Sequence, residues 1–193
     1  MRLCYTLLIL LFALNVYYAQ RSNPFENITV GLDAAVTVYD NTFKEYWNSG
    51  NAFGLSVSTP FYYGNLDAGL IFNPYYAKDK EQPDFSGLLI YLQWSENVLT
   101  YQNTSLSLGL STGLYQMIFD KTEEYYNQSD LFEHEITIGL SALLSHKIEN
   151  NLSANITCQY HTIYFRKKLS FVYIGASLRY SFQTPDWLKE FLD

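Results

Sequence analysis

The sequence of 193 residues is poor in cysteine and in positive charge, and after its first nineteen positions it has no long apolar run. Of its 2 cysteines, Cys4 lies in the N-terminal apolar stretch, so removal of that stretch would leave Cys158 alone and exclude an internal disulfide. The 12 basic residues stand against 19 acidic ones, which argues against nucleic acid as a partner. No stretch after residue 19 has the length of a transmembrane helix.

The N-terminal stretch has the pattern of a secretory signal peptide. Arg2 supplies the positive start, residues 7–14 form the apolar core, and Ala19 ends a plausible cleavage site. The apolar core is short for a retained membrane anchor. The sequence therefore predicts an exported protein in which residues 1–19 are removed.

Residues 170–182 alternate between two kinds of side chain. The even positions, from Val172 to Phe182, are apolar or aromatic, whereas the odd positions are mostly small or polar. Successive side chains of a strand point to opposite faces, so this pattern predicts a strand with one apolar face. Seven upstream segments repeat the pattern, and strands are expected at 28–39, 52–63, 66–76, 88–95, 106–115, 132–144, 152–164 and 170–182.

The connections between these segments alternate between long and short, except for the brief last one at 166–168. An even number of strands with short turns on one side and long loops on the other is typical of outer-membrane barrels. Outward aromatic residues gather near both ends of the strands, as two membrane interfaces would select. The predicted fold class is therefore all-β, an eight-stranded antiparallel up-and-down transmembrane β-barrel with a short amphipathic C-terminal tail.

A soluble barrel of the lipocalin type is the alternative. Such a barrel would turn its apolar face inward and a charged face toward water. The non-apolar face of these segments is instead rich in glycine and serine and carries few charges. Because this composition suits a narrow, crowded lumen better than a solvated surface, the membrane barrel is favoured.

The last predicted strand resembles the C-terminal signal by which the barrel-assembly machinery recognises outer-membrane barrels. Tyr180 and Phe182 occupy the aromatic places, and Gly175 and Ser177 supply small residues displaced from the usual positions. Across residues 28–182 the chain resembles the small eight-stranded barrels of the OmpA transmembrane, OmpX and OmpW kind. The resemblance implies the outer membrane of a Gram-negative bacterium, with its lipid as a partner, and it does not fix function.

The chain continues beyond the aromatic residue that usually ends such a barrel. Thr184, Pro185 and Asp186 precede Trp187 and further apolar residues, a pattern that predicts a capped amphipathic helical turn. The expected organisation is a signal peptide at 1–19, a barrel at 20–182, and a periplasmic or interfacial tail at 183–193.

Six ionisable residues are expected to face the lumen, and Arg179 should lie beside Asp33 where the last strand closes on the first. A buried charge requires a partner, so we expect a structural ion network rather than a catalytic site. The six residues are Asp33, Asp67, Glu133, Glu135, His161 and Arg179.

Some eight-stranded barrels modify lipid A, and such an enzyme needs a histidine close to a carboxylate and a nucleophile or an activated water. His134 lies between two glutamates at the loop end of its strand, and His146 follows Ser145 directly at the opposite end. No catalytic residue is therefore assigned, and no enzymatic activity is predicted. The loop carboxylates lack the spacing of an ion-binding loop, so no metal or cofactor is expected.

The function predicted from the sequence is that of a small outer-membrane barrel with a lumen largely filled by side chains. A structural or surface-interaction role would use the loops at 40–50, 78–86 and 119–131, where a ligand or protein could bind. The alternatives are a narrow channel, a carrier for a small apolar molecule, or a lipid A-modifying enzyme. Four loop aromatics could contact a partner or pack on the barrel rim: Tyr46, Trp47, Tyr125 and Tyr126.

Overall fold

The computed structural model describes residues 24–39, 41–79, 82–120, 132–164 and 168–192. In this part of the chain nine strands and two short helices follow one another. The strands are β1 (Asn27–Tyr39), β2 (Trp47–Ser49), β3 (Asn51–Pro60), β4 (Asn65–Ala77), β5 (Phe85–Tyr101), β6 (Thr104–Phe119), β7 (Phe132–Lys147), β8 (Leu152–Tyr164) and β9 (Lys168–Gln183). The helices are α2 (Asn41–Tyr46) and α3 (Asp186–Leu192), and neither is long and apolar enough to cross a membrane.

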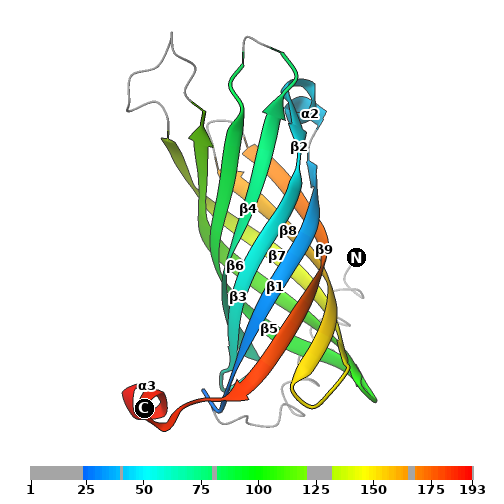
Figure 1. Cartoon of the computed structure of the whole chain (residues 1–193), viewed down its shortest axis with the longest axis vertical. Coiled ribbons are helices and arrows are strands. Elements are labelled where there is room, and N and C mark those ends of the chain that lie inside the picture. The colour runs from blue at the N-terminus through cyan, green and yellow to red at the C-terminus, as the bar shows by residue number, and fades with distance from the viewer. Residues whose placement is uncertain (1–23, 40, 80–81, 121–131, 165–167, 193) are drawn as a thin grey trace, which may run out of the picture.

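Eight of the strands close into a barrel (Figure 1). Every pairing is antiparallel, and β1 closes the barrel by pairing with β9 from Asn27 opposite Gln183 to Tyr39 opposite Phe171. The short strand β2 extends the line of β3 beyond Gly50 and pairs with the loop-side end of β4. These pairings confirm the predicted fold class, an eight-stranded antiparallel barrel followed by a short C-terminal helix.

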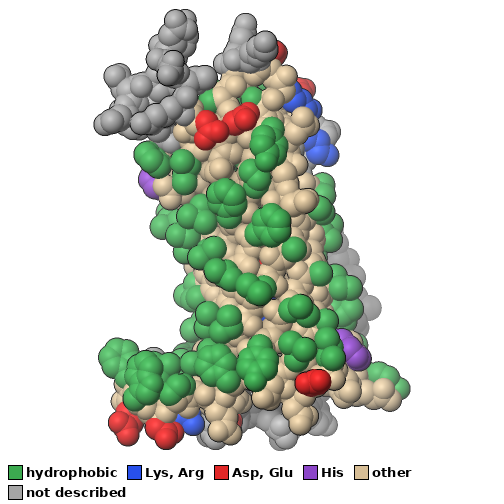
Figure 2. Space-filling view, in the orientation of Figure 1, with side chains coloured by type: hydrophobic (Ala, Val, Ile, Leu, Met, Phe, Trp, Pro, Cys, Tyr) green, Lys and Arg blue, Asp and Glu red, His purple; other side chains and the backbone are tan. Residues whose placement is uncertain are grey.

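The alternation along the strands separates a lipid-facing surface from the lumen. Leu32, Leu140 and Leu178 are exposed on the outside, whereas their strand neighbours on the inner face are small or polar. Figure 2 shows apolar side chains distributed over the visible wall of the barrel. A continuous apolar surface of this extent is unfavourable in water and matches the hydrocarbon core of a membrane.

The predicted link at 96–100 is wrong, because these residues belong to β5. They continue to pair with β6 until Tyr101 faces Thr104, and the register shifts between Asn97 and Leu99. This bulge moves the outward side chains from even positions such as Trp94 to odd positions such as Leu99. The period-two pattern therefore breaks at the bulge although the strand goes on.

Replacing Leu140 with arginine is expected to lower the free energy of unfolding by about 2–4 kcal/mol, as charges on the lipid face do near the bilayer midplane. Leu140 is outward-facing at the middle of β7. Urea unfolding of the barrel in lipid vesicles measures the change. The matched control is Thr100→Arg at the exposed turn end of β5, which should lower the free energy of unfolding much less. Equal losses in the two variants would contradict the membrane placement of the wall.

Candidate functional site

The loop-side half of the lumen is filled by an aromatic plug. We use this name for Phe43, Tyr75, Phe85, Tyr115 and Phe171, which are all buried. Tyr75 stacks on Phe85 with a ring-centroid separation of 4.5 Å, and Tyr115 stacks on Phe171 at 5.6 Å. Offset and edge-to-face contacts of this kind stabilise aromatic pairs beyond the burial of their area.

Helix α2 places Phe43 at the centre of the plug. The Phe43 ring lies 5.5 Å from Tyr75, 5.7 Å from Phe85 and 5.5 Å from Phe171, in edge-to-face geometry. Phe43 is only 6% exposed although it belongs to a connection between strands. In Figure 1, α2 lies at the loop-side end of the barrel, above β1 and β3. The stretch 40–50 is therefore partly built into the barrel mouth.

Three contacts fix α2 and β2 to the neighbouring loop. Trp47 donates a hydrogen bond from Nε1 to the carbonyl of Pro83 at 3.0 Å, and the Lys78 amide donates to the carbonyl of Tyr46 at 2.8 Å. The Lys78 ammonium also donates to the carbonyl of Lys44. Trp47 thus packs on the barrel rim, whereas Tyr46 of the same turn is exposed. Tyr125 and Tyr126 lie outside the described residues.

The turn-side half of the lumen is polar. It contains a cavity of about 230 Å³ whose lining is mostly serine and asparagine, with Asp67 and Arg179 among the lining residues. Arg179 Nη1 lies 3.2 Å from Asp67 Oδ1, and the two side chains are 11% and 3% exposed. Ser95 donates its hydroxyl to the other oxygen of Asp67 at 3.0 Å. The buried carboxylate thus has one cationic and one neutral partner.

Arg179 reaches Asp67 because the residues beside it on β1 and β3 are small. Gly31 pairs with Arg179 across the closure of the barrel, and a Cβ atom at Gly31 would lie 3.2 Å from Arg179 Cγ and 2.5 Å from Ser56 Oγ. Asp33, which the sequence places beside Arg179, instead accepts a hydrogen bond from the Ser56 hydroxyl at 3.2 Å. The arginine therefore pairs across the lumen with β4 and not with its neighbouring strand.

The remaining predicted lumen residues lie at other levels of the barrel. His161 is buried, with Nε2 3.3 Å from Gln159 Oε1 and its ring between those of Tyr91 and Tyr173. Glu133 is exposed and Glu135 is half-buried near the loop-side start of β7. The structure thus brings Asp67 and Arg179 into direct contact, and a wider ion network through the other four residues remains a prediction.

The other two histidines lie on the outer side of the barrel. His134 is exposed near the start of β7, and His146 Nδ1 lies 2.9 Å from the Thr104 hydroxyl near the turn-side end. Within the described residues, no group of three histidine, cysteine or acidic side chains is close enough to hold a metal ion.

The residues of the predicted assembly signal divide between the two faces of β9. Tyr180 and Phe182 are exposed on the lipid-facing side, and Ser177 is buried toward the lumen. Gly175 lies against Ala35 of β1 on the lumen side, where an added Cβ atom would come 2.6 Å from the alanine side chain. Recognition of these residues by the assembly machinery remains a prediction.

Sequence reasoning missed Phe43, the residue at the centre of the aromatic plug. The signal was present, because Phe43, Tyr46 and Trp47 have the i, i+3 and i+4 spacing of one helix face. The stretch is only six helical residues long, and most of its other residues are polar. So short a segment is not helical without tertiary contacts, which the sequence alone does not display.

No protein-family model and no curated protein matches the sequence. Among solved structures, Neisserial surface protein A has a TM-score of 0.61 at 14% identity, over 83% of this chain and 100% of that one. The attachment invasion locus protein Ail of Yersinia pestis, in a bilayer nanodisc, has a TM-score of 0.51 at 14% identity, over 81% and 99%. Ail in complex with the heparin analogue sucrose octasulfate has a TM-score of 0.50 at 10% identity, over 82% and 100%.

At these identities the similarity shows the fold. The chain has the architecture of the small eight-stranded outer-membrane barrels, as its last strand and its loop pattern predicted. Its exposed apolar wall adds an independent physical argument, because hydrocarbon is the environment in which such a wall is stable. Fold and surface together place the barrel in a bacterial outer membrane.

Proposed function

We propose that this outer-membrane barrel has a structural or surface-interaction role exerted through its loop-side end. The aromatic plug is the observation that carries the proposal. Phe43, Tyr75 and Phe171 meet within 5.5–6.3 Å between ring centroids at the loop-side mouth, where a solute path would have to pass. Because side chains fill the lumen, the outer surface of the loops is the part of the protein that can contact a partner.

The loop-side rim has the features of a contact surface. Lys44, Glu45 and Tyr46 are exposed on α2, while the buried Phe43 and the Trp47 hydrogen bond hold the same turn in place. A fixed backbone that presents exposed side chains loses little conformational entropy when a partner binds. Tyrosine is also among the residue types that contribute most to protein interfaces.

Charge favours one class of partner. The loop-side connections at 40–50, 78–84, 120–131 and 165–167 contain nine acidic and six basic residues. An excess of negative charge repels polyanions and attracts cationic surfaces. Ail has been crystallised with a sulfated ligand. The acidic loops of this chain instead support binding to a protein that carries a basic patch.

A narrow channel is the second candidate, and the turn-side cavity is the observation that favours it. The cavity of about 230 Å³ extends to residues 149–151 of the turn between β7 and β8, and it is lined by hydroxyl and amide groups that water and small polar solutes can contact. Conduction would require the aromatic plug to move. The same polar lining gives less support to a carrier for an apolar molecule.

Two measurements test the proposal, one on the refolded protein and one on cells that display it. We expect no steady ion conductance in planar bilayers, because the plug fills the lumen. We also expect bacterial cells that display the protein to attach to an immobilised basic protein more strongly than to an immobilised acidic one. The double variant Glu45→Ala and Tyr46→Ala should reduce that attachment.

The control is Trp187→Ala, which changes a side chain at the opposite end of the barrel and should leave attachment unchanged. Steady conductance of the wild-type protein would overturn the surface-interaction role in favour of the channel. Attachment equal to that of cells without the protein would count against any adhesive role for these loops.

A further inference from the structure

We propose that α3 is an interfacial membrane anchor whose apolar face inserts among the phospholipid headgroups of the leaflet on the turn side. The inference is independent of the loop-side role, because α3 follows the last strand at the other end of the barrel. It assigns a lipid-binding task to the residues that follow the usual end of such a barrel.

The side chains of α3 segregate into two faces. Trp187 and Phe191 are one turn apart and are 70% and 81% exposed. At 100° per residue they lie within one apolar arc that also includes Leu188, whereas Asp186, Lys189 and Glu190 lie in the opposite arc. A short helix with large aromatic residues on one face and charges on the other is typical of segments that lie in a membrane interface.

The connection to the barrel is short and fixed, so the position of α3 is set by the end of β9. The Thr184 amide donates to the carbonyl of Glu26 at 3.1 Å, and Thr184 is buried. Pro185 then starts the helical turn, since its carbonyl accepts from the amides of Leu188 and Lys189 at 2.9 and 3.1 Å. The helix therefore leaves the barrel at the level of the last β9 residues and cannot move far from it.

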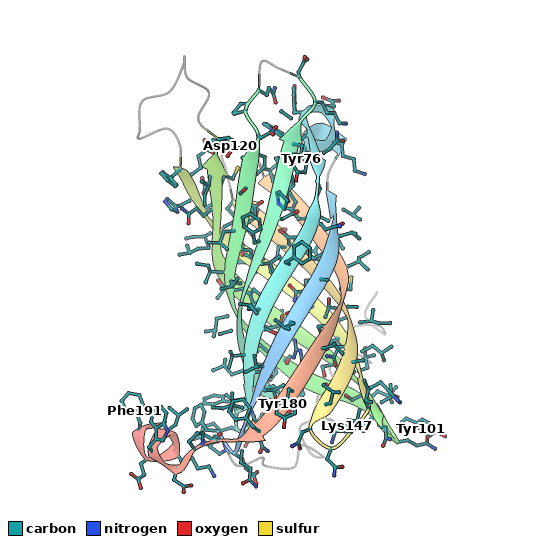
Figure 3. All side chains as sticks on the ribbon, viewed as in Figure 1. Tyr76, Tyr101, Asp120, Lys147, Tyr180 and Phe191 are labelled. Carbon is teal, nitrogen blue, oxygen red and sulfur yellow. The ribbon has the colours of Figure 1, made fainter. Side chains whose placement is uncertain are left out.

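That level is rich in outward aromatic residues. Tyr180 and Phe182 precede α3 on β9, and Tyr62 and Tyr63 are exposed in the neighbouring turn between β3 and β4. Tyr101 is exposed on another flank of the same end, as Figure 3 shows. Aromatic residues gather at the headgroup level of membrane proteins because their rings are amphipathic. The turn-side interface thus coincides with the height of α3.

The orientation of α3 agrees with this placement. In Figures 1 and 3 the helix projects sideways from the foot of the barrel. Figure 2 shows apolar side chains on the upper side of the helix, at the height of the wall's lower apolar belt, while its charged side chains lie on the underside. A membrane that covers the belt would therefore also cover the apolar face of α3. This shared height with the lipid-facing surface identifies lipid as the occupant.

The test uses Trp187 as a fluorescent reporter in the full-length barrel. The sequence contains 3 tryptophans, so Trp47→Phe combined with Trp94→Phe leaves Trp187 alone. In vesicles of zwitterionic phospholipid we expect its emission to lie at shorter wavelength than that of an indole in water. Phospholipid brominated near the headgroup end of its chains should reduce the emission at least about twofold, as expected for a ring at the interface.

A matched control moves the reporter to the charged face of the same helix. Trp187→Leu with Glu190→Trp in the same background should give emission closer to that of water and weaker quenching by brominated lipid. Emission from Trp187 that is water-like and unquenched would overturn the anchor. Shielding of Trp187 from both brominated lipid and aqueous acrylamide would also overturn it, in favour of a protein partner or a second copy.

Heat-modifiable gel mobility shows whether each variant has formed the barrel before its fluorescence is read. A second measurement needs no substitution. A photoactivatable phospholipid mixed into the vesicles should cross-link to the wild-type chain within residues 184–192, and mass spectrometry locates the adduct. Adducts confined to the barrel strands would contradict the proposal even if the tryptophan variants fail to fold.

Discussion

Replacing Arg179 with alanine is expected to lower the free energy of unfolding by about 3–5 kcal/mol, the usual cost of leaving a buried charge without its partner. Asp67 would keep only the Ser95 hydroxyl, 3.0 Å from its Oδ2 atom, and a neutral donor does not balance a buried negative charge. The polar cavity beside the pair admits water, which favours the lower end of this range. Urea unfolding of the barrel in lipid vesicles measures the change.

A double-mutant cycle separates the ion pair from other effects of the substitution. Asp67→Asn removes the negative charge and keeps the shape, so the double variant Asp67→Asn with Arg179→Ala should cost clearly less than the sum of the two single losses. Such coupling is expected because Arg179 Nη1 and Asp67 Oδ1 are 3.2 Å apart. Strictly additive losses would show that the pair contributes little, and that the lumen hydrates each charge independently.

The barrel itself could be predicted from the sequence because the membrane imposes a simple rule on every strand. Positions such as Leu32 and Leu178 must be apolar, and their neighbours must fit a narrow lumen, so one alternation repeats along the whole chain. The rule failed where a bulge at Asn97 changed the outward parity and β5 ran on to Tyr101. The alternating pattern shows which side chains point outward and which point into the lumen. It does not show that a strand continues after a bulge has shifted the alternation by one residue.

Knowing which side chains point into the lumen was not enough to predict the ion pair. Asp33 and Asp67 both point inward, and the sequence favours Asp33 because β1 is the neighbour of β9. The choice of Asp67 depends on the stagger of the strands, which sets the residues that share one level of the lumen. In the observed register Asp33 faces Ser177, so Arg179 lies two residues nearer the turn side, opposite Gly31, and extends across the lumen to β4.

The two halves of the lumen are filled by different kinds of side chain. The turn-side half keeps small polar residues, a cavity and one ion pair, so it tolerates water. The loop-side half excludes water by packing rings against one another, and one of those rings comes from outside the strands. Closure at the loop side therefore depends on α2, a segment whose own six residues are too few to be stable as a helix.

Replacing Phe43 with alanine is the direct test of that dependence. Truncation of a buried phenylalanine typically costs about 3–5 kcal/mol, and here the loss should fall on the attachment of α2 because the strand ladders do not involve Phe43. Local opening of α2 exposes the backbone after Lys44 to trypsin. We expect cleavage between Lys44 and Glu45 to accelerate more than about tenfold, since proteolysis follows the population of the open form.

Two controls assign the effect to the plug. Phe43→Leu keeps an apolar side chain between Tyr75 and Phe171 and should accelerate cleavage much less, whereas Tyr46→Ala removes an exposed ring from the same helix and should leave cleavage near the wild-type rate. All three variants should retain heat-modifiable mobility because the closing pairs of β1 and β9 are untouched. Unchanged cleavage in Phe43→Ala would mean that the Trp47 bond to Pro83 and the Lys78 bonds to the α2 carbonyls hold the segment. In that case the Phe43 ring would fill the mouth of the barrel without holding α2 in place.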